Sequence, residues 1–261
     1  MSRARELNWI QTSTHHAETV VLVHAVGHDL TYWDRQIEVL SASYNVIAFD
    51  LPGHGRSATS PSEWSFPFAA NVVAELITGL SASPVHLVGI SFGGMIAQVT
   101  ALTHPELIRS LTLIGTAPSF PEEVRQGMRG RAELVRTQGM AAVVESSLQR
   151  WFTQKTQESR PDITDRLTKT LLGDDAATHA AIWDIISGLD LDDRLSEITC
   201  PTLVLVGEQD PSTPPSVARR LAGAIKGSAL VEIPDASHIV TVEAPSAVNT
   251  ALLSFLADSA L

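Results

Sequence analysis

The fold of this chain is decided by one stretch, Val85-His86-Leu87-Val88-Gly89-Ile90-Ser91-Phe92-Gly93-Gly94-Met95. Its first four residues are mostly apolar and β-branched, which predicts a strand buried on both faces. The pentapeptide from Gly89 to Gly93 has the pattern G-x-S-x-G, and an apolar helical pattern follows it through Leu102. A serine on a sharp turn from strand to helix is typical of the nucleophile elbow. The pattern alone also fits an ordinary tight turn with an exposed serine, but here both flanking elements are present.

Steric and electrostatic reasons support this interpretation of Ser91. We expect the serine to adopt a strained backbone conformation on the turn. Side chains at positions 89 and 93 would collide with the neighbouring helix and strand, so both positions require glycine. The amino terminus of the following helix directs unpaired N–H groups and a partial positive charge at the serine. Such an arrangement stabilises a developing oxyanion.

The composition indicates one undivided domain of 261 residues, 44% of them hydrophobic. The formal net charge of −11 argues against nucleic acid and anionic membranes as partners. Cys200 is the single cysteine, so no intramolecular disulfide can form. The sequence has neither an apolar stretch long enough to span a membrane nor an amino-terminal secretion signal, so we expect a cytoplasmic protein. Whether the chain forms a homo-oligomer stays open.

Strand and helix patterns alternate along most of the chain. Strands are expected at 7–11, 19–24, 44–50, 85–88, 108–114, 201–207 and 229–233, and helices at 32–40, 68–80, 94–102, 217–225 and 246–256. This alternation predicts a mostly parallel, twisted sheet flanked by helices, which is an α/β fold. Ligands of such sheets bind at the carboxyl ends of the strands, and Ser91 lies at such an end.

Residues 118–193 interrupt the alternation. They carry polar and charged helical patterns and no strand. We therefore expect a core domain made of residues 1–117 and 194–261, with a helical cap inserted at 118–193.

A serine hydroxyl is a weak nucleophile without a base. In this arrangement the partners follow in the chain order serine, acid, histidine, each after a strand. Asp210 and His238 occupy such positions, although each taken alone could be a turn or surface residue. The loop at 115–118 has no carboxylate, which favours Asp210, and the rival acid Glu208 lies nearer the strand end. The sequence thus predicts a triad of Ser91, Asp210 and His238.

The predicted roles follow from this triad. His238 takes the Ser91 proton and later protonates the leaving group, while Asp210 holds the imidazole tautomer. We expect the oxyanion donors to be the backbone N–H groups of Phe92, after the nucleophile, and of Val26, after the first buried strand. No histidine or cysteine spacing indicates a metal site, so we expect no metal and no cofactor.

Five motifs resemble those of the α/β-hydrolase superfamily and span nearly the whole chain. They are His24–Gly27, Asp50–Ser57, Gly89–Gly94, Gly207–Asp210 and Ala236–His238. The resemblance implies the α/β-hydrolase fold with an inserted helical cap. It also implies a carboxylic-ester hydrolase whose partner is a small-molecule ester or lactone.

Shorter matches resemble the 3-oxoadipate enol-lactonases within this superfamily. They are His24–Asp29 with Trp33, Arg150–Thr153, Gly188–Leu191 and Pro211–Pro215. The resemblance implies that Ser91 attacks the ring carbonyl of a small enol-lactone and releases a keto acid. We expect Trp151 and Trp183 to line the substrate pocket. Arg150 then faces either a substrate carboxylate or solvent.

Other activities on the same residues stay open. A short-chain carboxylesterase, a C–C hydrolase, an amidase or a perhydrolase would use the same triad, because the pocket rather than the fold selects the substrate. Outside the enzymes, the alternative is a ligand receptor with this fold.

Overall fold

The computed structural model describes residues 7–58, 64–82 and 84–259. The first six residues, which belong to the segment expected to lack a secretion signal, lie outside these ranges. Within them a seven-stranded sheet has the order β1-β3-β2-β4-β5-β6-β7. The strands are β1 (Trp9–Gln11), β2 (Thr19–Val23), β3 (Asn45–Phe49), β4 (Val85–Ile90), β5 (Ile108–Ile114), β6 (Thr202–Gly207) and β7 (Ala229–Ile233). Only β1 pairs antiparallel, and the other pairs between these strands are parallel, as predicted.

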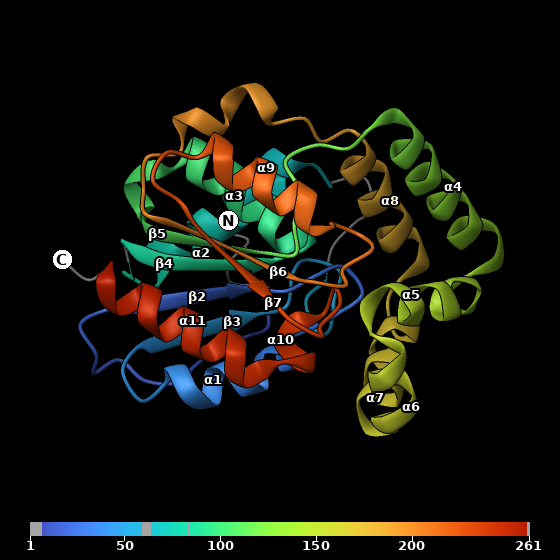
Figure 1. Cartoon of the computed structure of the whole chain (residues 1–261), viewed down its shortest axis with the longest axis horizontal. Coiled ribbons are helices and arrows are strands. Elements are labelled where there is room, and N and C mark those ends of the chain that lie inside the picture. The colour runs from blue at the N-terminus through green and yellow to red at the C-terminus, as the bar shows by residue number, and fades with distance from the viewer. Residues whose placement is uncertain (1–6, 59–63, 83, 260–261) are drawn as a thin grey trace.

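Helices cover both faces of this sheet (Figure 1). One face carries α1 (Asp34–Leu40) and α11 (Pro245–Asp258), and the other carries α2 (Phe66–Gly79), α3 (Phe92–Thr103) and α9 (Pro215–Ala224). Shorter helices connect them: α10 (Val240–Glu243) and the 3-10 turns Leu30–Trp33, Pro105–Leu107, Met140–Val143 and Asp192–Glu197. Because helices lie on both sides, every residue of β2, β3 and β4 is buried.

Capping side chains account for two of the helix starts that differ from the expected ranges. The helix expected at 32–40 is a 3-10 turn followed by α1, and Asp29 accepts a hydrogen bond from the Thr31 N–H at the start of that turn, at 3.0 Å. Helix α2 begins two residues earlier than expected, because the Ser65 hydroxyl accepts from the Phe68 N–H at 3.1 Å.

The segment between β5 and β6 forms five helices, called here the helical insertion. They are α4 (Glu122–Gln138), α5 (Val144–Trp151), α6 (Gln154–Ser159), α7 (Pro161–Leu172) and α8 (Ala176–Ser187). Figure 1 shows them beyond one end of the sheet, with α4 and α8 side by side. A bridge between Ser119 and Asp190 joins the two ends of the insertion.

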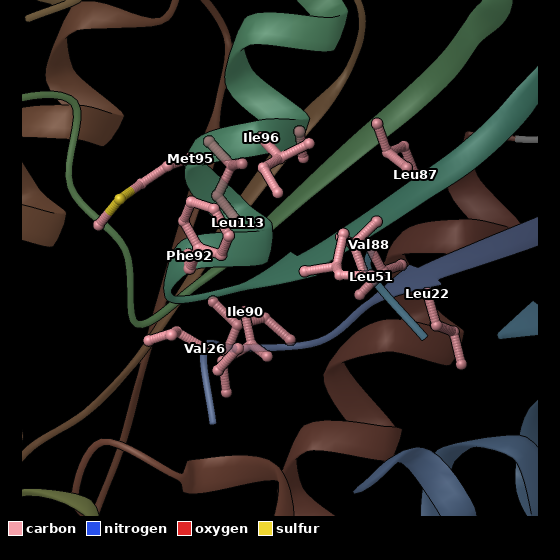
Figure 2. Packing of buried hydrophobic residues seen from close by; sticks show 14 of the residues in the cluster. Leu22, Val26, Leu51, Leu87, Val88, Ile90, Phe92, Met95, Ile96 and Leu113 are labelled. Carbon is pink, nitrogen blue, oxygen red and sulfur yellow. The ribbon is translucent and has the colours of Figure 1, made fainter. Parts of the chain in front are cut away.

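The turn between β4 and α3 rests on an apolar core (Figure 2). Leu87 and Val88 come from β4, and Phe92 and Ile96 come from the first turns of α3; all four are fully buried. Each such side chain contributes about 1.5–3 kcal/mol by leaving water. This packing holds the start of α3 against the carboxyl end of β4.

Within residues 7–58, 64–82 and 84–259, no helix combines the length and the apolar character needed to cross a membrane. The cytoplasmic location stays a prediction, and the oligomeric state stays open. The boundaries of the core and cap also stay predictions.

Candidate active site

Ser91 occupies the turn between β4 and α3 with a φ of 51° and a ψ of −115°. This backbone conformation is rare for a residue with a side chain and costs about 1–3 kcal/mol. Two hydrogen bonds of 2.8 Å hold the turn: the Ser91 N–H donates to the Ile114 carbonyl, and the Thr116 hydroxyl donates to the Ser91 carbonyl. The strained backbone expected from the sequence is confirmed.

The glycines around Ser91 are required by close backbone contacts. A Cβ atom on Gly89 would lie closer than 3.0 Å to the backbone of Gly93 in α3. A Cβ atom on Gly93 would lie closer than 3.0 Å to the carbonyl oxygens of Val23 and His24. The predicted collisions with the neighbouring helix and strand are confirmed.

His238 and Asp210 meet Ser91 at the carboxyl edge of the sheet. The Nε2 atom of His238 lies 2.9 Å from the Ser91 Oγ atom, and its Nδ1 atom lies 2.8 Å from the Asp210 Oδ2 atom. Asp210 follows β6 and His238 follows β7, so both loops start at the edge where β4 ends. The structure therefore joins the three side chains in one hydrogen-bonded chain.

The Asp210 carboxylate is buried but well supplied with donors. Its Oδ1 atom accepts from the N–H groups of Ser212 and Thr213, at 2.8 and 3.0 Å. Burial opposes its ionisation, but His238 and the Thr213 donors outweigh burial and lower the pKa of Asp210 below its usual value. The rival Glu208 is exposed, and its side chain faces the N–H of Asp235 at 3.5 Å.

Gly115 lies in the loop after β5, where the sequence has no carboxylate. A Cβ atom there would stand 3.3 Å from the Asp210 Oδ2 atom and 3.5 Å from the His238 Nδ1 atom. This loop therefore packs directly against the pair. Because Gly115 lies this close to the Asp210–His238 pair, the loop after β5 contacts the pair but supplies no acid to it, and the acid comes from the loop after β6.

A cavity of about 900 Å³ opens over Ser91 and His238. Residues of the core and of the helical insertion both line it. Its apolar walls include Ala25, Val26, Met95, Phe120, Pro121, Val124, Met128, Trp151, Trp183, Ile186, Pro214 and Val217. Both tryptophans singled out from the sequence thus face the same space as the serine.

One expected oxyanion donor directly follows Ser91 in the chain, and the other lines the same cavity as Ser91. Phe92 is the first residue of α3, and Val26 lies in the loop after β2 and lines the cavity. Neither backbone N–H donates a hydrogen bond to an oxygen of the residues that the structure describes. Both amides can therefore serve an oxygen bound beside Ser91.

Two arginines lie over the Trp183 indole on the cavity wall. The guanidinium carbons of Arg131 and Arg150 are 4.9 and 5.4 Å from the ring centroid. Arg131 donates to the hydroxyls of Ser146 and Ser147, and Arg150 donates through Nε to the Ser146 carbonyl. Neither guanidinium has a carboxylate within 4.0 Å in the described part of the chain. Burial lowers the pKa of both groups.

Arg131 is a cavity residue that the sequence interpretation missed. It lies in α4 among three further arginines, Arg125, Arg129 and Arg136, and the helix has few buried residues. Such a charged helix normally presents its side chains to water. Arg125 also lines the cavity, but its guanidinium pairs with Asp190 at 3.7 Å. No local signal in the sequence separates these two arginines from Arg129 and Arg136.

Three buried histidines support the loops beneath the cavity. His24 contacts the Ala25 carbonyl through Nδ1 at 2.8 Å and accepts from the Leu51 N–H at 2.9 Å, while His54 contacts a backbone carbonyl at 3.3 Å. Both side chains therefore bond to the backbone of loops near the site. Burial lowers the pKa of His24 and His28 to about 4 and that of His54 to about 3. In the described ranges, no cluster of three or more His, Cys, Asp or Glu side chains is arranged to hold a metal ion.

Comparison of sequences relates the chain to characterised enzymes. The family model described as alpha/beta hydrolase fold matches residues 18–245. The 3-oxoadipate enol-lactonase 2 of Acinetobacter baylyi is 32% identical over 233 residues, which cover 89% of this chain and 86% of that protein. The resemblance inferred from the motifs is confirmed.

Solved structures agree over nearly the full length. The enol-lactonase from Burkholderia xenovorans superposes with a TM-score of 0.90 at 29% identity, covering 96% of both chains. A thermophilic esterase from Thermogutta terrifontis, solved with malate bound, also gives a TM-score of 0.90, at 30% identity, covering 98% of this chain and 94% of that one. The predicted fold class is confirmed, and the chain belongs to the α/β-hydrolase family.

Proposed function

We propose that this protein is a serine hydrolase that cleaves a small lactone or ester through an acyl-enzyme on Ser91. The observation that carries the proposal is the hydrogen-bonded chain from Asp210 through His238 to the Ser91 hydroxyl on the floor of a cavity. A base within hydrogen-bond reach of the hydroxyl, itself oriented by a buried carboxylate, is the arrangement that nucleophilic catalysis needs.

The reaction would proceed in two halves. In the first, the Ser91 Oγ atom attacks the carbonyl carbon while His238 Nε2 takes the hydroxyl proton, and Asp210 stabilises the resulting imidazolium. The N–H groups of Phe92 and Val26 stabilise the oxyanion, each by about 3 kcal/mol. His238 then gives the proton to the leaving oxygen, which in a lactone stays attached to the acyl group. In the second half, His238 activates a water that hydrolyses the acyl-enzyme.

We infer that the substrate carries a carboxylate, as an enol-lactone of the 3-oxoadipate type does. Arg131 and Arg150 line the same cavity as Ser91 and lack a carboxylate partner among the described residues. A substrate carboxylate would supply that partner through charge-assisted hydrogen bonds. Two similar proteins support this choice, because one is named for 3-oxoadipate enol-lactone and the other holds malate, a dicarboxylic acid.

A carboxylesterase acting on longer acyl chains is the second candidate. The cavity of about 900 Å³ is also lined by the apolar side chains of Phe120, Val124 and Met128 and of Val217 in α9. That space is near the upper end of pockets that enclose drug-sized ligands, and exceeds what a small lactone fills. C–C hydrolysis, amide hydrolysis and perhydrolysis stay alternatives on the same triad.

Active-site labelling tests the proposal. A fluorophosphonate should add its mass to Ser91, and p-nitrophenyl acetate should release a burst of p-nitrophenol, whereas Ser91→Ala should do neither. A panel of an acidic enol-lactone, acidic esters and neutral esters of increasing acyl length then identifies the substrate class. Absence of labelling in the folded wild type would refute the hydrolase. Labelling without turnover of any panel member would favour the receptor alternative.

A further inference from the structure

A second buried hydrogen-bonded chain lies inside the helical insertion. The Nδ1 atom of His179 is 3.2 Å from the Asp174 Oδ2 atom, and the Trp183 Nε1 atom is 2.9 Å from the His179 Nε2 atom. His179 and Trp183 are four residues apart in α8 and so share one helix face. The side chains of Asp174 and His179 are only 4% and 1% exposed. This chain of hydrogen bonds ends at the Trp183 indole, over which the guanidinium groups of Arg131 and Arg150 lie.

Hydrogen-bond chemistry allows one arrangement of protons along this chain. An indole N–H only donates, so the His179 Nε2 atom has to accept and carries no proton. The neutral imidazole then carries its proton on Nδ1, which donates to Asp174. The Trp183 N–H therefore selects this histidine tautomer, and an oxygen of the Asp174 carboxyl accepts the remaining His179 N–H and so fixes the orientation of the ring.

We propose that Asp174 and His179 are positioning residues that hold the Trp183 indole against Arg131 and Arg150 and thereby set the affinity for anionic substrates. The proposal rests on the proposed function, because it presupposes that the two guanidinium groups bind a substrate carboxylate. Rotation of an unanchored indole would remove the surface on which both cations stack. The productive alignment of a bidentate guanidinium would then be lost.

The surroundings keep His179 neutral, as this arrangement requires. Burial is the main cause that holds the pKa of His179 well below its usual value, and the other contributions come from Arg131, His54, Arg150 and His28. Burial also raises the pKa of Asp174 to about 8. The Nε2 atom of His54, in the core, lies 4.0 Å from the Asp174 carboxyl and has no hydrogen-bond partner in the described chain. The pair of Asp174 and His179 thus lies where the helical insertion meets the core.

Steady-state kinetics on an acidic ester and a neutral ester of the same length test the proposal. His179→Phe keeps a planar ring but removes the acceptor for Trp183. It should raise KM for the acidic ester roughly tenfold and leave both kcat and the KM of the neutral ester within about twofold of wild type. His179→Gln restores an acceptor and should return KM for the acidic ester to within about threefold of wild type.

The matched control is His86→Phe, a buried histidine in β4 whose Nδ1 atom is 2.7 Å from the Ser110 hydroxyl, outside the cavity lining. Its ratio of the two KM values should equal that of wild type. If His179→Phe changes both substrates equally, or if His179→Gln restores nothing, the positioning role is overturned. If wild type shows no preference for the acidic ester, the inferred carboxylate substrate fails instead.

A measurement on the wild-type protein covers the case in which a variant does not fold. The ¹⁵N chemical shifts of the His179 ring should report a neutral imidazole protonated at Nδ1 at pH 7, and the Trp183 indole N–H should exchange slowly with solvent. A ring protonated at Nε2, or an imidazolium, would overturn the proposal whatever substrate the enzyme uses.

Discussion

The hydroxyl of Thr213 donates a hydrogen bond to the same oxygen of Asp210 that faces His238, and both distances are 2.8 Å. Thr213 also donates its backbone N–H to the other carboxylate oxygen. One residue thus fixes the orientation of the carboxylate and favours its ionised form. The acid of the proposed triad depends on a neighbour three residues away in the chain.

Removal of that hydroxyl should weaken catalysis without abolishing it. We expect Thr213→Val to lower kcat roughly fivefold to tenfold with little change in KM, because a hydrogen bond to a charged group is worth about 1.5–3 kcal/mol and only part of it bears on the transition state. Turnover of p-nitrophenyl acetate measures the effect. Thr213→Ser keeps a hydroxyl and serves as the control. A valine variant with full activity would contradict this role.

A methyl group at position 93 should disrupt the fold. Gly93→Ala would place a Cβ against the backbone carbonyls of Val23 and His24, and neither can move without breaking the sheet, so we expect a loss of about 3 kcal/mol of unfolding free energy. Gly130→Ala is the matched control, because its Cβ would meet nothing within 4 Å on an exposed helix and should stabilise by about 0.5–1 kcal/mol. Urea denaturation distinguishes the two, and similar midpoints would contradict the steric argument.

Arg150 and Arg131 should contribute to the binding of acidic substrates alone. We expect Arg150→Gln and Arg131→Gln each to raise KM for an acidic lactone roughly 10-fold to 100-fold, because each removes a charge-assisted hydrogen bond. The KM for a neutral ester should stay unchanged. Arg129→Gln is the control on the same helix as Arg131, since Arg129 pairs with Glu122 at the surface. Equal effects on both substrates would refute the role.

The stability of the protein should be greatest near pH 6.5. His24, His28 and His54 stay neutral in the folded protein down to about pH 4, 4 and 3, whereas unfolded histidines bind protons below about 6.5. As the pH falls below 6.5 the unfolded state therefore gains protons that the folded state does not. Each histidine then removes about 1.4 kcal/mol of stability per pH unit. Unfolding free energies from urea titrations at pH 5, 6 and 7 measure this slope.

Asp174 should make the protein less stable as the pH rises above 6.5. Its pKa of about 8 means that the folded state keeps a proton which the unfolded state has lost above about pH 4. Stability from this group falls as the pH rises to about 8, by up to about 1.4 kcal/mol per unit, and below pH 6.5 the three histidines outweigh it. Asp174→Asn should abolish the decline between pH 6.5 and 8 and leave the acid decline in place. A flat profile in wild type from pH 5 to 8 would contradict both assignments.

The positions of Ser91, Asp210 and His238 could be predicted because each follows a strand that the sequence pattern identifies. Parallel strands end at a common edge, so residues far apart in the chain meet there once the strands are identified. The elbow adds a local requirement, since backbone contacts exclude side chains at Gly89 and Gly93. These constraints act through the main chain and are therefore visible in residue types and spacing.

In the helical insertion, residue types and spacing do not show which side chains face the cavity. Its polar helices have no register with the sheet, so the packing of the helices on one another, such as α4 on α8 and α5 on α7, decides which of their side chains face inward. For this reason the sequence predicts neither the position of Arg131 in the cavity nor the hydrogen bonds from Asp174 through His179 to Trp183. For Arg150 the sequence predicts either a substrate carboxylate or solvent as the partner, and only the structure shows its guanidinium over the Trp183 indole.

The sheet, the strained serine and the family could all be predicted from residue types and spacing, because backbone sterics and the alternation of strands and helices leave short, local patterns in the sequence. The size of the cavity, the stacking of Arg131 and Arg150 on the Trp183 indole, and the buried hydrogen bonds that hold this indole became visible only in the folded structure. Those features arise where helices from distant parts of the chain pack together, and the side-chain directions that result depend on the whole set of contacts.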